Sequence, residues 1–147
     1  MKKIIALLLL IPVLVNAQQL PSIADKTKGL TKLDGFLPFY RDDANGKIWL
    51  EINKLDTELL YVMSLPAGLG SNDIGLDRGL LGGGRIVKFS RIGKKVLMIE
   101  PNYGYRAISN AERERAAVEQ SFAQSTLWGF AVEAEQAGAV LVDATEF

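Results

Sequence analysis

The sequence predicts an α+β fold in which an antiparallel β-sheet built from hairpins dominates and a single α-helix interrupts the strands. Three observations predict this class. Apolar and polar residues alternate along several short runs, which is the period of a half-buried strand. Asn45-Gly46 and Gly93-Lys94 separate such runs at hairpin distance. The period changes to that of a helix only once, near residue 111.

Residues 1–17 have the pattern of a secretory signal peptide, so an N-terminal signal helix is expected. Two lysines precede an apolar stretch from Ile4 to Val15, and Ala17 stands at the expected cleavage site. This stretch is short, because a helix needs about 20 residues to span a bilayer. We therefore expect an exported protein with no stable membrane span after cleavage, in the periplasm, at the outer membrane or outside the cell. An uncleaved anchor is the alternative.

The composition excludes several function classes. Cleavage leaves 15 basic and 17 acidic residues, which gives no electrostatic attraction to nucleic acid. The chain has no histidine, which excludes a Ser-His-Asp triad and a histidine zinc site. It has no cysteine, which excludes a disulfide framework.

The elements are expected in the following order. Residues 18–35 form a polar segment with one or two helical turns, capped by Ser22 and stopped by Gly29. Residues 36–65 hold three runs, including "KIWLEIN" and "ELLYVMSL", and predict a three-stranded antiparallel meander. After a glycine-rich segment, "RIVKFSRI" and "KVLMIEP" predict a second hairpin, and "YGYRA" a short extra strand.

A helix and two strands complete the expected domain. "SNAE" has the form of a capping box before "AERERAAVEQSFAQ", whose Val118 and Phe122 form a modest apolar stripe. Two further strands flank a turn at Ala137-Gly138. The chain ends just after a strand, so we expect an exposed sheet edge there. Residues 36–147 are therefore expected to be a β-rich domain truncated at its C-terminal end.

The glycine-rich segment "AGLGSNDIGLDRGLLGGG" does not match a nucleotide site. Gly70 and Gly75 have the spacing of a P-loop, but Leu76-Asp77 follow where lysine and serine or threonine are needed. Asn72, Asp73 and Asp77 carry oxygen ligands, but their spacing does not fit an EF-hand. We expect instead that the glycines supply backbone freedom, that Asn72 and Asp73 bond loop backbone, and that Asp77 pairs with Arg78.

The other charged and aromatic residues are also expected to have structural roles. Glu133 and Glu135 are expected on a solvated strand face rather than as a catalytic pair, and Arg113 and Arg115 on a solvated helix face. The aromatic residues in alternating runs are expected in the core or on the sheet, namely Trp49, Tyr61, Phe89, Trp128 and Phe130. No catalytic, cofactor or metal site is therefore expected within this chain.

Several stretches together resemble one protein family. They are "LPSIADKTKGLTKLDGFLPFY", "KIWLEI", "ELLYVMSLPAGLGSNDIGLDRG", "RIVKFSRIGKKVLMIEPNYGYRA" and "AVEQSFAQSTLWGFAVEAE". The chain resembles the N-terminal segment, a domain of unknown function, of large exported bacterial zinc-dependent metalloproteases. The resemblance runs from about Leu20 to Phe147 and is most specific in "GLGSNDIGLDRG"; Leu80 stands where a polar residue is expected.

The resemblance implies a non-catalytic domain whose partner is the downstream catalytic domain of the same polypeptide, with a peptide substrate passing nearby. Zinc is implied only for that downstream domain, because its H-E-x-x-H motif has no counterpart here. Whether the chain itself counts as an enzyme stays open. A stand-alone exported module that binds a peptide or glycan is the alternative. The glycine-rich loop is the expected interdomain contact, through Gly68, Gly70, Asn72, Asp73, Gly75, Asp77 and Arg78.

Overall fold

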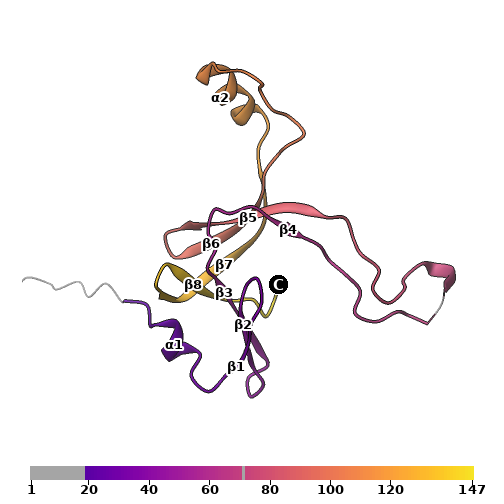
Figure 1. Cartoon of the computed structure of the whole chain (residues 1–147), viewed down its shortest axis with the longest axis vertical. Coiled ribbons are helices and arrows are strands. Elements are labelled where there is room, and N and C mark those ends of the chain that lie inside the picture. The colour runs from indigo at the N-terminus through magenta and orange to yellow at the C-terminus, as the bar shows by residue number, and fades with distance from the viewer. Residues whose placement is uncertain (1–18, 71) are drawn as a thin grey trace, which may run out of the picture.

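Eight strands form one sheet in the computed structural model, which describes residues 19–70 and 72–147 (Figure 1). The order across the sheet is β1-β2-β3-β8-β7-β6-β5-β4, and each neighbouring pair is antiparallel. The strands are β1 (Thr31–Leu33), β2 (Phe39–Asp42), β3 (Lys47–Ile52), β4 (Leu59–Tyr61), β5 (Arg85–Ile92), β6 (Lys95–Glu100), β7 (Ser125–Gln136) and β8 (Ala139–Asp143). The predicted antiparallel, β-rich class is confirmed, whereas the predicted signal peptide lies outside the described residues.

The last strand, β8, lies in the interior of the sheet between β3 and β7. Val142 is paired with Leu50 on one side and with Val132 on the other. The expectation of an exposed edge at this strand is therefore wrong. The physical reason is that β8 carries apolar side chains on both faces, with Val140 and Val142 in one cluster and Leu141 in another, and a continuous apolar run of this kind is typical of a strand inside a sheet with both faces buried.

The predicted three-stranded meander over residues 36–65 is also wrong in its third member. The β2–β3 hairpin forms around the expected turn, and β1, within the segment read as merely polar, adds to it. The third run, however, crosses to the far end of the sheet, where β4 pairs with β5. On the way Leu55 forms a parallel bridge with Phe89, and the N–H of Asp56 donates to the Phe89 carbonyl at 2.8 Å.

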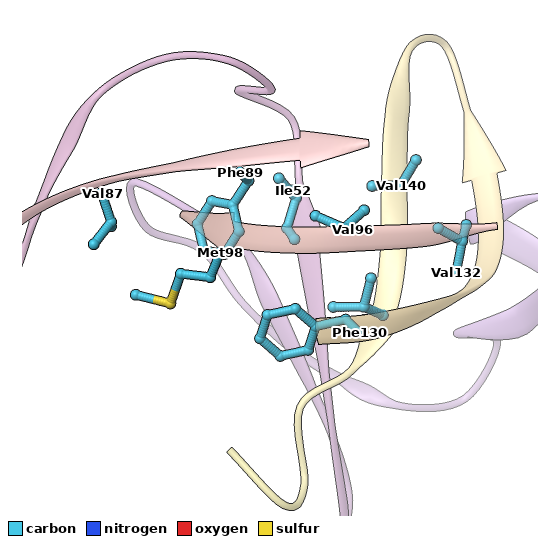
Figure 2. Packing of buried hydrophobic residues seen from close by; sticks show 9 residues of the cluster. Ile52, Val87, Phe89, Val96, Met98, Phe130, Val132 and Val140 are labelled. Atoms are coloured by element: carbon cyan, nitrogen blue, oxygen red, sulfur yellow. The ribbon is translucent and has the colours of Figure 1, made fainter. Parts of the chain in front are cut away.

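This crossing curls the sheet, so that strands distant in the sheet order share one core. Figure 2 shows side chains from β3, β5, β6, β7 and β8 turned toward one another. Ile52 from β3 packs in the same cluster as Phe89 from β5. The buried members of this cluster are Ile52, Val87, Phe89, Val96, Met98, Phe130, Val132, Val140 and Val142.

A second, smaller cluster lies on the opposite face under the short helix α1 (Ile23–Lys26). The predicted cap is present, because the Ser22 hydroxyl accepts from the N–H of Asp25 at 3.0 Å. A register shift between Val132 and Ala134 in β7 places Val132 in the main core and Ala134 in the second cluster. The predicted strict alternation of this strand is therefore broken by a bulge.

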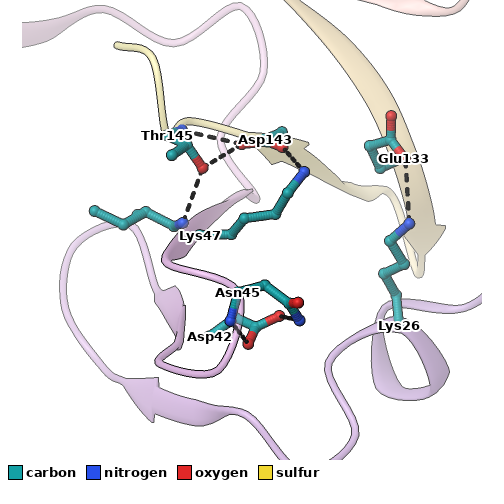
Figure 3. A network of polar contacts seen from close by, with 8 residues as sticks. Lys26, Asp42, Asn45, Lys47, Glu133, Asp143 and Thr145 are labelled. Carbon is teal, nitrogen blue, oxygen red and sulfur yellow. Dashed lines mark hydrogen bonds and ion pairs between the residues drawn. The ribbon is translucent and has the colours of Figure 1, made fainter.

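A polar network fastens the C-terminal turn to β3 (Figure 3). The Asp143 carboxylate accepts from Lys47 Nζ at 2.7 Å and from the backbone N–H and hydroxyl of Thr145 at 3.0 and 2.5 Å. The N–H of Ile48 in turn donates to the Thr145 hydroxyl at 3.1 Å. Partial burial favours the protonated carboxyl, but these donors outweigh burial and lower the pKa of Asp143 to about 2.

The second helix, α2 (Glu112–Ser121), stands off the sheet (Figure 1). Its N-cap is Ala111, which makes no side-chain cap, and the Ser109 hydroxyl accepts from the N–H of Ala111 instead, so the predicted capping box is wrong. No residue of α2 is buried. Phe122 at its end stacks on Tyr105 at 3.9 Å, and residues 103–107 do not form the predicted strand.

Candidate interaction surface

Residues 62–84, which we call the arm, connect β4 to β5 and extend away from the sheet (Figure 1). Its two sides are joined near the base. The N–H of Gly82 donates to the Met63 carbonyl at 2.8 Å, and the N–H of Leu65 donates to the Leu80 carbonyl at 3.0 Å. The arm is therefore a continuation of the β4–β5 hairpin, with its own backbone bonds.

Glycines shape the outer part of the arm in two ways, through positive φ angles and through close backbone approach. Gly70, Gly75 and Gly79 have positive φ angles of 74°, 64° and 80°, which side chains other than glycine rarely adopt. At Gly68 the reason is close approach, since a Cβ there would lie 3.0 Å from the backbone nitrogen of Arg78. Substitution at any of these positions would change the path of the loop.

The charged residues of the arm do not form the expected ion pair. Among the residues that the structure describes, neither Asp77 nor Arg78 is part of a salt bridge. Both are exposed, as is Asp73 in the short 3₁₀ turn η1 (Asn72–Ile74). Backbone bonds hold this region instead, from Gly79 N–H to the Leu65 carbonyl and from Leu80 N–H to the Asp77 carbonyl.

Apolar side chains are exposed along the whole arm. Leu69 and Leu81 are each 68 % exposed. The other large apolar residues exposed in this segment are Val62, Met63, Ile74, Leu76 and Leu80. Contiguous exposed apolar surface of this kind is typical of sites that another molecule covers. The arm is therefore a candidate interaction surface, and most of its exposed large side chains are apolar.

A groove of about 560 Å³ runs along the inner side of the arm. Six apolar residues of the arm line it, namely Val62, Met63, Leu65, Leu76, Leu80 and Leu81. Phe147 closes its other side, with ring centroids 5.8 Å from Tyr61 and 5.7 Å from Trp128. None of the lining residues is charged. The groove therefore suits an uncharged, apolar occupant.

The sequence interpretation singled out this loop for its glycines and charged residues but did not include the exposed apolar side chains. The run "ELLYVMSL" predicts a strand that includes Val62 and Met63, whereas β4 ends at Tyr61. A signal was present, because the leucines at 76, 80 and 81 lie among glycines with no strand period. Leu80, where the resemblance leads us to expect a polar residue, lines the groove.

The two acidic residues of β7 that were considered as a catalytic pair make structural contacts. Glu133 and Glu135 are not merely solvated, because Glu133 pairs with Lys26 at 3.1 Å and Glu135 pairs with Arg91 at 2.7 Å. Among residues 19–70 and 72–147, no group of three or more acidic, cysteine or histidine side chains could hold a metal ion. Within the same residues, no helix is long and apolar enough to cross a membrane.

Comparison with known families gives one match. Residues 79–147 match a domain of unknown function (DUF5117). The matched region begins in the returning side of the arm and includes β5 to β8. No curated protein and no solved structure matches the chain. The match supports the resemblance only as far as a domain of unknown function over these residues.

Proposed function

We propose that the chain is the non-catalytic N-terminal domain of an exported zinc-dependent metalloprotease, and that its arm docks onto the catalytic domain downstream in the same polypeptide. The observation that carries the docking role is the exposed apolar surface of the arm. The resemblance of "GLGSNDIGLDRG", which lies within the arm, supports the choice of partner. Peptide-bond hydrolysis belongs to the downstream domain in this proposal, because the present chain has no histidine to bind zinc.

Burial of the arm would contribute substantially to docking. Full burial of one leucine side chain stabilises a complex by about 1.5–3 kcal/mol, and Leu69 and Leu81 are both largely exposed. The backbone bonds at the base of the arm hold it before docking, which lowers the entropy cost of ordering it in a complex. The lack of charge in the groove also avoids desolvation of charged groups.

The test is co-expression of this domain with the separate downstream region. We expect the two parts to co-purify and the catalytic part to gain stability and activity. The double variant Leu69→Glu/Leu81→Glu should reduce co-purification at least tenfold, because it places two charges in the apolar contact. Ile108→Glu is the matched control, since Ile108 is 91 % exposed outside the arm and its replacement should leave co-purification unchanged.

Two results would overturn the proposal. One is a catalytic region that is fully stable and active without this domain. The other is a reading frame that stops at codon 147 rather than continuing to an H-E-x-x-H motif. A stop there, together with a folded product, would favour the alternative of a stand-alone exported module that binds a peptide or glycan.

A further inference from the structure

A second hollow lies where the arm and the α2 excursion leave the sheet. It has a volume of about 460 Å³, within the range of about 300–1,000 Å³ that small-ligand sites occupy. Its lining includes Arg85 at the start of β5, Glu100 at the end of β6, residues 101–104 and Ala123. The hollow is separate from the apolar groove, with which it shares no lining residue.

The side chains in this hollow combine one flat ring with several fixed polar groups. Arg85 pairs with Glu100 at 2.8 Å, which fixes the orientation of both side chains in the hollow. Asn102 and Ser125 add an amide and a hydroxyl, and Tyr103 adds an exposed ring. Donors and acceptors therefore surround an aromatic ring, which can hold both the hydroxyls and the C–H face of a ligand.

The polar groups of this hollow come from two strands that are each paired on the outer side. Arg85 is paired with Tyr61 of β4, and Glu100 is paired with Ser125 of β7. The pairing of β5 with β6 extends only as far as Lys88 and Ile99, so the hollow opens beyond the last β5–β6 pair. Its many polar side chains suit a ligand rich in hydroxyl groups.

We propose that this hollow binds a carbohydrate, with a sugar ring stacked on Tyr103 and its hydroxyls bonded to Arg85, Glu100 and Asn102. The lining also includes two small residues, Gly104 and Ala123. A Cβ added at Gly104 would lie 3.4 Å from Asn102 Oδ1. The inference does not depend on a downstream domain, because every lining residue belongs to this chain.

The experiment titrates the isotope-labelled chain with cellotriose, maltotriose and the trimer of N-acetylglucosamine, and follows backbone amide shifts by NMR. We expect at least one trisaccharide to shift the amides of Gly84 and Gly104 saturably at millimolar concentration. Tyr103→Ala should weaken that binding about tenfold, which corresponds to about 1.4 kcal/mol of binding free energy. Ala123→Trp should abolish it by filling the hollow while leaving every polar group in place.

Tyr105→Ala is the matched control. Tyr105 is 58 % exposed against 56 % for Tyr103, yet it stacks on Phe122 and does not line this hollow. Its variant should bind as the wild type does. The proposal is overturned if no trisaccharide shifts these amides, if the two tyrosine variants weaken binding equally, or if a neutral tripeptide binds here and the sugars do not.

Discussion

At the scale of single residues, Asp143 connects the end of the chain to its core. Its carboxylate holds Lys47 of β3 and both donors of Thr145, and the Ala144 N–H donates to the Ile48 carbonyl at 2.8 Å. Because this turn is fixed, Phe147 lies against Phe130 with ring centroids 5.4 Å apart. The contacts of Asp143 therefore help to set the position of Phe147, which closes the groove.

Asp143→Asn tests this role through the pH dependence of stability. The folded pKa of about 2 is below the ordinary value of 3.8, so the stabilisation is fully present above pH 3.8 and is lost as pH falls toward 2. Urea unfolding should show the variant to be less stable by about 1–2 kcal/mol at pH 6, once solvent screening is allowed for. The difference should shrink below pH 3.8.

The control for this prediction is Asp73→Asn, at the exposed tip of the arm. Its unfolding should follow the wild type at each pH. If the Asp143 variant also follows the wild type between pH 6 and pH 2, the network contributes nothing to stability and Lys47 does not hold the carboxylate in solution.

At the scale of elements, hairpins whose signals are local were predicted well. "RIVKFSRI" matches β5 in full, and "KVLMIEP" matches β6 except for its final proline, because period two and a tight turn are properties of adjacent residues. The prediction for α2 was less accurate. Its capping box did not form and its apolar stripe stayed unburied, because burial depends on neighbours that the local pattern does not specify.

In the β7–β8 turn, we expect substitutions at two adjacent residues to change the stability of the chain in opposite directions. Ala137 and Gly138 both have positive φ, at 50° and 84°. Gly138→Ala should destabilise the chain by about 1–2 kcal/mol, the cost of a left-handed conformation for a residue with a Cβ. Ala137→Asn should stabilise it by about 0.5–1 kcal/mol, because asparagine tolerates that conformation in two-residue turns.

Gly83→Ala is the control for the turn variants, since its φ is not in the positive region and an added Cβ meets nothing within 4 Å. It should cause no loss of stability in urea unfolding. A Gly138→Ala variant as stable as Gly83→Ala would show that the turn relaxes to another conformation in solution.

At the scale of the whole molecule, a curled sheet supports two projections of different chemistry. The arm exposes leucines, and the excursion to α2 exposes Tyr103, Tyr105 and Ile108. Both begin where β5 and β6 leave the shared core (Figure 1). The rigid part is therefore the sheet, and the surfaces available to partners lie on segments outside it.

Hydrogen exchange should separate these parts. Amides of β6, β7 and β8, whose side chains fill the core, should exchange only through global unfolding. Amides of residues 66–70, 73–78 and 105–122 should exchange at least a hundredfold faster, because none of their side chains is fully buried. Mass spectrometry after timed labelling measures this. Equal protection in the arm and in β7 would contradict the division into sheet and projections.

The sequence by itself determined the antiparallel class, the local hairpins, the glycine-shaped loop and the lack of a histidine zinc ligand. Each of these depends on residue identity or on the spacing of neighbours. Only the tertiary structure decided that β8 lies inside the sheet, that β4 pairs with β5, and that the arm's leucines stay exposed. The reason is physical: periodicity shows which side of a strand is apolar, whereas the packing of distant segments decides what covers it.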